Sequence, residues 1–291
     1  MKFSERYGYV KPAEVLKRGF LDEEGTTALC NCYDYLAMWF NHYDVNQSYR
    51  RHDESYTELE ENIWCFFMNK RRDDFYTGFG HMIAATEYLK SEQYEWYLKF
   101  DLIEFTISRL RRSTPQGDRG YQQVVEAFVM LLNATFKRLD YAYRVVDDQI
   151  VEITDQEEIS AIEGAIKQSS TVGTHLSESL KLLSSRPEPN YRNSIKESIS
   201  AVEALCREIT GETTLGTALK SLETNGVKIP RFLQTGIEKL YVYTNNPHTG
   251  IRHALMDGSE VPTFEEAKYM LVMCSAFVNY IQGKRVNNDV R

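Results

Sequence analysis

The stretch AYRVVDDQIVEIT, Ala142 to Thr154, lies near the middle of the 291-residue sequence and differs from the sequence around it. It is rich in β-branched residues, which favour extended strands, and Asp147-Asp148 at its centre is typical of a tight turn. This pattern predicts a short β-hairpin. It is the only strong strand pattern in the chain, so the rest of the fold must come from helices.

On the N-terminal side, apolar residues recur every three or four positions, the spacing of one helix face. This spacing predicts a helical region from Leu21 to about Leu139, with breaks at 71–80 and 113–120 where Gly, Pro and charged residues cluster. Within it, further helices are expected at about Glu54–Lys70, Gly80–Lys90, Glu92–Arg111 and Tyr121–Leu139.

On the C-terminal side, Thr154-x-x-Glu157 has the spacing of a capping box, and the leucines and isoleucines that follow indicate one interrupted helix or two consecutive ones. The proline-containing segment Ser184–Asn190 reads as a linker. Thr263-x-x-Glu266 is a second candidate capping box, at the start of the last helix. Helices are expected after these breaks at Tyr191–Thr210, Leu215–Glu223, Pro230–Val242 and Thr263–Gln282.

The sequence therefore predicts an all-α fold with one small β-hairpin and two packed helical domains, 1–155 and 156–291. The N-terminal domain is expected to supply recognition or oligomerisation. The C-terminal domain contains the candidate site.

Charge and hydrophobicity exclude several classes of protein. A net charge of −8 opposes broad, nonspecific attraction to nucleic acid or to anionic membranes, although a local basic patch is compatible with it. We find no run of eighteen apolar residues and no apolar leader at the N-terminus, so a cytoplasmic protein without a membrane partner is expected. The five cysteines are expected to be reduced, mostly buried thiols.

Known cofactor-binding patterns are missing from the sequence. There is no Gly-rich phosphate loop, no metal-binding His pair and no second pair of ligands to complete a zinc site with Cys30 and Cys32. We therefore expect no cofactor and no metal, and hydrolysis of a nucleotide by a P-loop is not expected.

One polar stretch lies between two helical segments: YTNNPHTGIRHAL, Tyr243 to Leu255. His253 is the main catalytic candidate, because an imidazole can remove and deliver a proton near neutral pH. Arg252 beside it could stabilise the negative charge of a pentacovalent phosphate. The alternative is that both residues cap helix ends and pair with carboxylates. In either case the loop is expected at the mouth of an antiparallel bundle.

The expected helix Tyr191–Thr210 places Arg192 and Glu203 on one side, because eleven residues are close to three helical turns. An Arg and a Glu beside an apolar stripe suggest a partly buried polar cluster that supports the loop, and the alternative is a structural ion pair. Glu197 is expected on the opposite, solvated face.

Short basic clusters occur at expected helix ends, where the helix dipole favours positive charge. They are Arg50-Arg51-His52, Lys70-Arg71-Arg72 and Arg109-Leu110-Arg111-Arg112. The alternative is that they form a surface for nucleic acid.

Several segments together resemble bacterial abortive-infection proteins: FSERYGYV (3–10), YRVVDDQIVEITDQEEI (143–159), NYRNSIKESISAVEALC (190–206), TLGTALKSLE (214–223), GIRHAL (250–255) and EEAKYMLVMCSAFVNYI (265–281). The N-terminal half resembles the AbiJ-type N-terminal domain, and the C-terminal half resembles the abortive-infection C-terminal domain. The resemblance implies kinship with the helical HEPN group, whose active members are metal-independent ribonucleases that usually pair to line one cleft.

The resemblance implies an Arg and a His with four to six residues between them, and this chain departs from that motif. Positions 246 to 248, before His253, hold Asn246, Pro247 and His248. Two hypotheses follow.

In the first, the protein cleaves cellular RNA or tRNA as a homodimer or higher homo-oligomer. His253 is then the general acid/base, Arg252 stabilises the phosphorane, Asn245 or His248 orients the RNA, and Glu203 with Arg192 supports the cleft. In the second, the protein is a noncatalytic helical sensor or adaptor that recognises a phage protein or controls a toxic partner.

Overall fold

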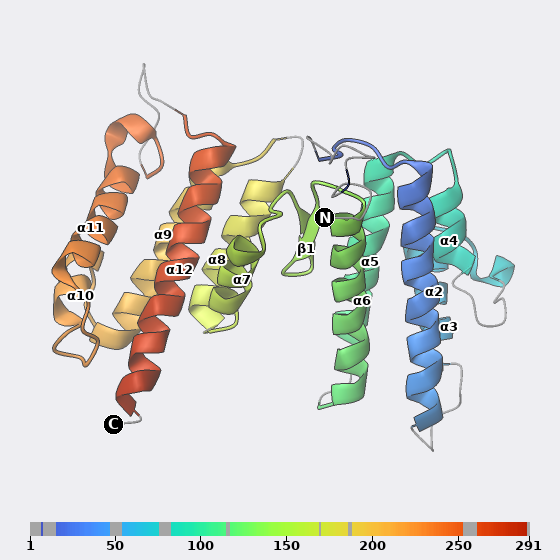
Figure 1. The fold of residues 1–291 in the computed structure, drawn as a ribbon, viewed down its shortest axis with the longest axis horizontal. Helices are drawn as coiled ribbons and strands as arrows, with labels where there is room; N and C mark the ends of the chain where they lie inside the picture. The colour runs from blue at the N-terminus through green and yellow to red at the C-terminus, as the bar shows by residue number, and fades with distance from the viewer. Residues whose placement is uncertain are drawn as a thin grey trace. The chain divides into compact units, whose positions relative to one another are not determined.

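The computed structural model describes residue 7 and residues 16–46, 54–75, 83–114, 117–168, 170–185, 188–252 and 261–289. The chain separates into two units, Met1–Ile153 and Thr154–Arg291. Helices dominate both, and one two-stranded antiparallel hairpin accompanies them (Figure 1). This confirms the predicted all-α fold with a small hairpin. No helix in the described ranges is both long and apolar enough to cross a membrane.

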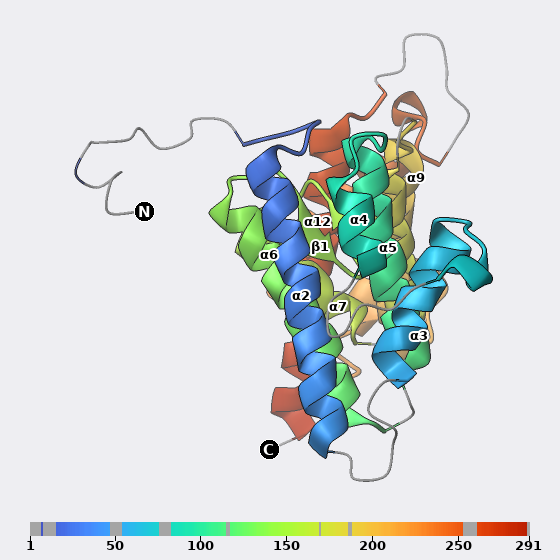
Figure 2. The ribbon, with the colours of Figure 1, turned by 90° about the vertical axis from the view of Figure 1, so that its right-hand side faces the viewer.

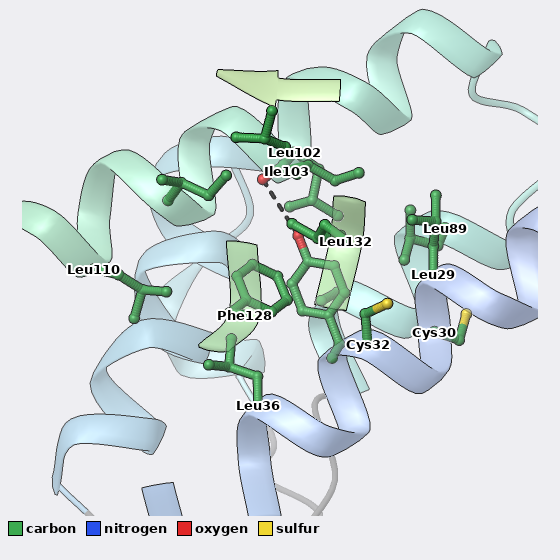
Figure 3. Close-up of a cluster of buried hydrophobic side chains, with 14 of the residues drawn as sticks. Leu29, Cys30, Cys32, Leu36, Leu89, Leu102, Ile103, Leu110, Phe128 and Leu132 are labelled. Atoms are coloured by element: carbon green, nitrogen blue, oxygen red, sulfur yellow. Dashed lines mark hydrogen bonds between the residues drawn. The ribbon is translucent and has the colours of Figure 1, made fainter. Parts of the chain in front are cut away.

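In the part of the N-terminal unit that the structure describes, five α-helices surround a core of aromatic and branched side chains. The helices are α2 (Glu23–Asn46), α3 (Glu54–Asn62), α4 (Ile83–Lys90), α5 (Trp96–Ser113) and α6 (Arg119–Arg138). Tyr33 lies fully buried at the centre, and its hydroxyl is 2.9 Å from Thr106 Oγ1, so this buried polar group is satisfied. Leu36, Phe128 and Leu132 belong to the same cluster (Figure 3).

The hairpin forms where it was predicted, with shorter strands: β1 (Arg144–Val146) and β2 (Gln149–Val151). Asp147 and Asp148 both have positive φ, 49° and 60°, as a two-residue type I′ turn requires. The side chain of Asn133 on α6 extends the pairing, because it accepts from Val145 N and donates to Val145 O. The hairpin is thereby fixed to α6.

A π-helical turn, Ile63–Phe67, follows α3 directly, where a continuous α-helix to Lys70 was expected. The bond from Met68 N to Ile63 O, 2.8 Å, spans five residues and defines this turn. A 3₁₀ turn follows at Arg72–Asp74. The prediction of one regular helix here was wrong.

The C-terminal unit is a helical bundle in which α9 (Tyr191–Thr210) contacts most of the other helices. Around it lie α8 (Ser170–Ser184), α10 (Leu215–Ser221), α11 (Arg231–Asn245) and α12 (Phe264–Asp289), and α7 (Gln156–Ile166) packs on α8 and α12. Small side chains let α8 and α9 approach closely. Ser179 Oγ lies 2.7 Å from Ser198 Oγ and donates to Ser194 O at 2.9 Å.

The two predicted capping boxes have different outcomes. At the start of α7 the cap is Asp155, whose side chain accepts from Glu158 N at 3.0 Å, so the prediction of Thr154 with Glu157 was wrong by one residue. At the start of α12, Thr263 N donates to Glu266 Oε2 at 2.8 Å, the half of the capping box in which the glutamate reaches back. These bonds to Thr263 lower the pKa of Glu266.

The cysteines form no disulfide. Cys30, Cys32, Cys206 and Cys274 are buried, as expected, and burial raises the pKa of each of these thiols. Cys65 in the π turn is only half-buried.

Candidate functional site

The helix that supports the candidate site, α9, is bounded by strong local caps. The side chain of Asn190 accepts from Asn193 N at 3.1 Å, and Gly211, with φ 74°, ends the helix in the left-handed conformation. One stripe of α9, which includes Ile195, Ile199 and Val202, is buried. Arg192 and Glu203 lie on one side of the helix, three turns apart.

The polar stretch Tyr243–Leu255 begins inside α11, which runs on to Asn245. The chain then turns through a short 3₁₀ helix, Pro247–Thr249. Asn246 caps this helix by accepting from His248 N at 3.0 Å, and the hydroxyl of Thr249 donates to Asn246 O at 2.8 Å. Several polar residues of the stretch are thus used to build the turn.

After this turn, the loop is held by Arg192. Its Nε and Nη2 both donate to the carbonyl oxygen of Gly250, which lies at the left-handed φ of 61°. A guanidinium fork on a single carbonyl is a charge-assisted contact, stronger than an ordinary hydrogen bond. Arg192 therefore fixes the backbone of the loop to the first turn of α9.

Two residues further on, Arg252 is held by Glu203. Arg252 Nη2 donates to Glu203 Oε2 at 2.7 Å, and the two side chains are 21% and 19% exposed. The guanidinium also lies over the ring of Tyr241 on α11, 5.3 Å from its centroid. Arg252 Nε is buried and has no acceptor among the described residues.

Cys206, one turn beyond Glu203 on α9, is not available as a nucleophile. Burial and, to a lesser extent, the charge of Glu203 raise the pKa of its thiol to about 12. A thiol that stays protonated at neutral pH neither attacks a substrate nor binds a metal. Among the described residues, no group of three or more His, Cys, Asp or Glu side chains is placed to hold a metal ion.

The predicted site residues are thus only partly brought together. Arg192 and Glu203, both on α9, contact different residues of the loop. Arg192 binds Gly250, and Glu203 binds Arg252. Asn245 folds its side chain back, donating from Nδ2 to Tyr241 O at 3.2 Å, and His248 is exposed on the 3₁₀ turn. His253, the main catalytic candidate, lies outside the described residues.

The prediction that Glu197 faces solvent was wrong. Its carboxylate lies 2.7 Å from His175 Nδ1 on α8, and both side chains are largely covered. The prediction assumed that α9 buries one face, whereas α8 covers a second. The roles of Tyr241 and Gly250 in the loop were not predicted, because they depend on how α11 and the loop pack on α9.

The comparison with known families gives one match. Residues 1–168 match the AbiJ N-terminal domain 4 family, and this is more than half of the chain. The chain therefore belongs to this family, which associates it with abortive infection, an anti-phage defence. The match covers the N-terminal unit and α7. No curated protein and no solved structure is detectably similar to the chain.

Proposed function

We propose that this abortive-infection protein is an RNA endonuclease that needs no metal, with its site at the loop that α9 holds. The observation that carries the proposal is the state of Arg252. Its guanidinium is fixed in place, yet its buried Nε has no acceptor among the described residues. A buried donor without a partner costs about 1–3 kcal/mol, and such groups occur where a ligand supplies the missing acceptor.

The chemistry available to this loop is an internal transesterification of RNA, in which the phosphoryl group moves from the 5′-oxygen of the next nucleotide to the neighbouring 2′-hydroxyl. The 2′-oxygen forms a bond to phosphorus as His253 takes its proton, and the bond from phosphorus to the 5′-oxygen breaks as that oxygen receives a proton. Arg252 binds the pentacovalent phosphate through the donors that Glu203 leaves free. Cellular RNA, tRNA included, is the proposed substrate class.

The supporting residues hold the loop in position. From α9, Arg192 holds the backbone carbonyl of Gly250, and Glu203 orients the side chain of Arg252, the residue before His253. Preorganisation of this kind supports catalysis, because groups placed in advance need no reorganisation in the transition state. A homodimer that pairs two such loops would provide one histidine as base and the other as acid.

Expression in bacteria under phage challenge tests the proposal. Wild type, His253→Ala and the control Lys220→Ala, at an exposed residue of α10, are compared at equal protein levels, by plaque counts and by total RNA on a denaturing gel. We expect wild type and Lys220→Ala to restrict phage and to yield discrete RNA fragments, and His253→Ala to do neither. Restriction by His253→Ala with intact RNA would rule out cleavage at this loop.

The second candidate is a noncatalytic sensor or adaptor that contacts a phage protein or a toxic partner. Large apolar side chains at the solvent surface of α11 favour it: Phe232 is 91% exposed, and Leu233 and Val242 are also exposed. In this case, Phe232→Ala would abolish restriction while His253→Ala would leave it unchanged.

A further inference from the structure

The π turn after α3 brings a phenylalanine to the surface. If the α-helix continued, Phe66 would lie within about 20° of Leu59 around the helix axis. Phe66 would then face the core, as Leu59 and Ile63 do. The π turn holds one more residue, so Phe67 takes that inward position and packs edge-on to Tyr88, with ring centroids 5.1 Å apart. Phe66 is left 67% exposed.

An exposed phenylalanine on a π turn is unfavourable for folding alone. Water contacts most of its ring, and π turns are rare and frequently found at functional sites. The side chain is nevertheless held in place, because the guanidinium of Arg109 on α5 lies 5.2 Å from its ring centroid and 5.0 Å from that of Phe105. The result is a flat aromatic face with a cation stacked beside it.

Further positive charge adjoins this face, although the whole chain is acidic. Arg112 is exposed one turn beyond Arg109 on α5. Neither Arg109 nor Arg112 has a carboxylate partner among the described residues. Lys70 lies instead over the ring of Trp64 at 4.0 Å, and Arg71 and Arg72 are paired with Asp73 and Glu61.

α3 and α5 lie side by side in the N-terminal unit (Figure 2), so the π turn and the last turns of α5 form one surface. We propose that this surface, Phe66 with Arg109 and Arg112, binds single-stranded nucleic acid. A base stacks on Phe66 beside the guanidinium of Arg109, and Arg112 contacts a neighbouring phosphate. Single strands fit because their bases are free to stack, which those of a duplex are not.

This inference is independent of cleavage at His253, since it concerns binding in the other unit. It explains how an acidic chain engages RNA: the local group of unpaired cations supplies the attraction that the net charge of −8 opposes. Stacking adds affinity with little dependence on sequence.

The test is binding of the full-length chain to a fluorescent 2′-O-methyl RNA oligonucleotide of about 12 nucleotides, which lacks the 2′-hydroxyl that cleavage needs. Fluorescence anisotropy gives the Kd. Phe66→Ala should weaken binding about tenfold, and Phe66→Trp should retain it. Phe232→Ala, which removes a still more exposed phenylalanine from the C-terminal unit, should bind like wild type. Arg112→Ala should reduce the slope of log Kd against log salt concentration by about the amount that one phosphate contact contributes.

Equal effects of Phe66→Ala and Phe232→Ala would overturn the inference, as would equal competition by duplex RNA. No binding at about 50 mM salt would also overturn it and favour a protein partner for this surface. His253→Ala separates the two proposals. If binding depends on Phe66 but wild type cleaves no RNA, this inference stands and the proposed nuclease activity is ruled out. If wild type cleaves RNA and Phe66→Ala does not change binding, the nuclease stands and this inference is ruled out.

Discussion

Two arginines, one in each unit, hold a turn of the chain, and they differ in how completely they are satisfied. Arg111 on α5 binds Asp148 of the hairpin turn through Nε and Nη2 and Glu126 of α6 through Nη1. Among the described residues, Arg252 has one hydrogen-bond acceptor, Glu203, and a buried Nε without an acceptor. A guanidinium whose three nitrogens all have carboxylate acceptors serves the fold, whereas one with a nitrogen to spare can bind a phosphate.

The largest effect is expected from removing the partner of the less exposed arginine. Glu203→Ala leaves the guanidinium of Arg252 covered and unpaired, and should lower the free energy of unfolding by about 3 kcal/mol. Urea denaturation measures this. Adding Arg252→Met to Glu203→Ala should recover part of the loss, because no charge is then left unpaired. A decrease in the free energy of unfolding below about 0.5 kcal/mol would mean that the Glu203–Arg252 pair contributes no more than an ordinary surface ion pair.

Glu60 on α3 is a carboxylate with no arginine partner among the described residues, so it sharpens the comparison. It is fully buried, and one oxygen accepts from Ala84 N at 3.0 Å. Burial raises its pKa to about 7, so the folded state binds a proton more tightly than the unfolded state. The contribution of Glu60 to stability is therefore fully present below about pH 4.5 and should fall by about 2 kcal/mol as pH rises to 7.

The control for this pH dependence is Glu60→Gln, which cannot ionise. Thermal unfolding at pH 5 and pH 8 should show a smaller difference for Glu60→Gln than for wild type. The same difference in both proteins would mean that Glu60 is not the group responsible.

Arg111→Ala should cost less than breaking the Arg252 pair, about 1 kcal/mol, because Arg111 and its partners are about a third or more exposed and screened by water. Restriction of phage should remain, since this arginine only fixes the hairpin. Urea denaturation and plaque counts on the same variant check both statements. Loss of restriction at unchanged stability would contradict a purely structural role.

The smallest effect should have the opposite sign. Asp147 has φ 49°, a conformation that glycine adopts without strain, so Asp147→Gly should stabilise the protein by about 0.5 kcal/mol. Asp147→Ala is the matched control and should destabilise it, as both are compared by thermal unfolding. A destabilising glycine would show that the side chain of Asp147 makes a necessary contact.

Local sequence patterns were sufficient for much of the fold. The hairpin was found from its β-branched residues and the Asp-Asp turn, and α9 was predicted over its observed range from its apolar spacing and the proline-containing linker before it. The structure adds Asn190 and Gly211 as its caps. The π turn was not predicted, because periodicity alone does not show that Phe67 rather than Phe66 fits the core. That choice depends on the packing of Tyr88 and Phe105 from other helices.

The candidate site was predicted in its residues and less well in its contacts. Helical spacing placed Arg192 and Glu203 on one side of α9. It did not show that Arg192 binds a backbone carbonyl, that Glu203 pairs with Arg252, or that Asn245 folds back on α11. These contacts depend on how the loop packs on α9, and the spacing of residues within α9 does not predict that packing.

The most direct test of the central claim uses the purified full-length chain with RNA in the presence of EDTA. We expect wild type to cleave the RNA and leave 2′,3′-cyclic phosphate ends, the control Lys220→Ala to do the same, and His253→Ala to be inactive with an unchanged unfolding temperature. Cleavage that requires a metal, or that persists in His253→Ala, would contradict the assignment of a metal-independent nuclease to this loop.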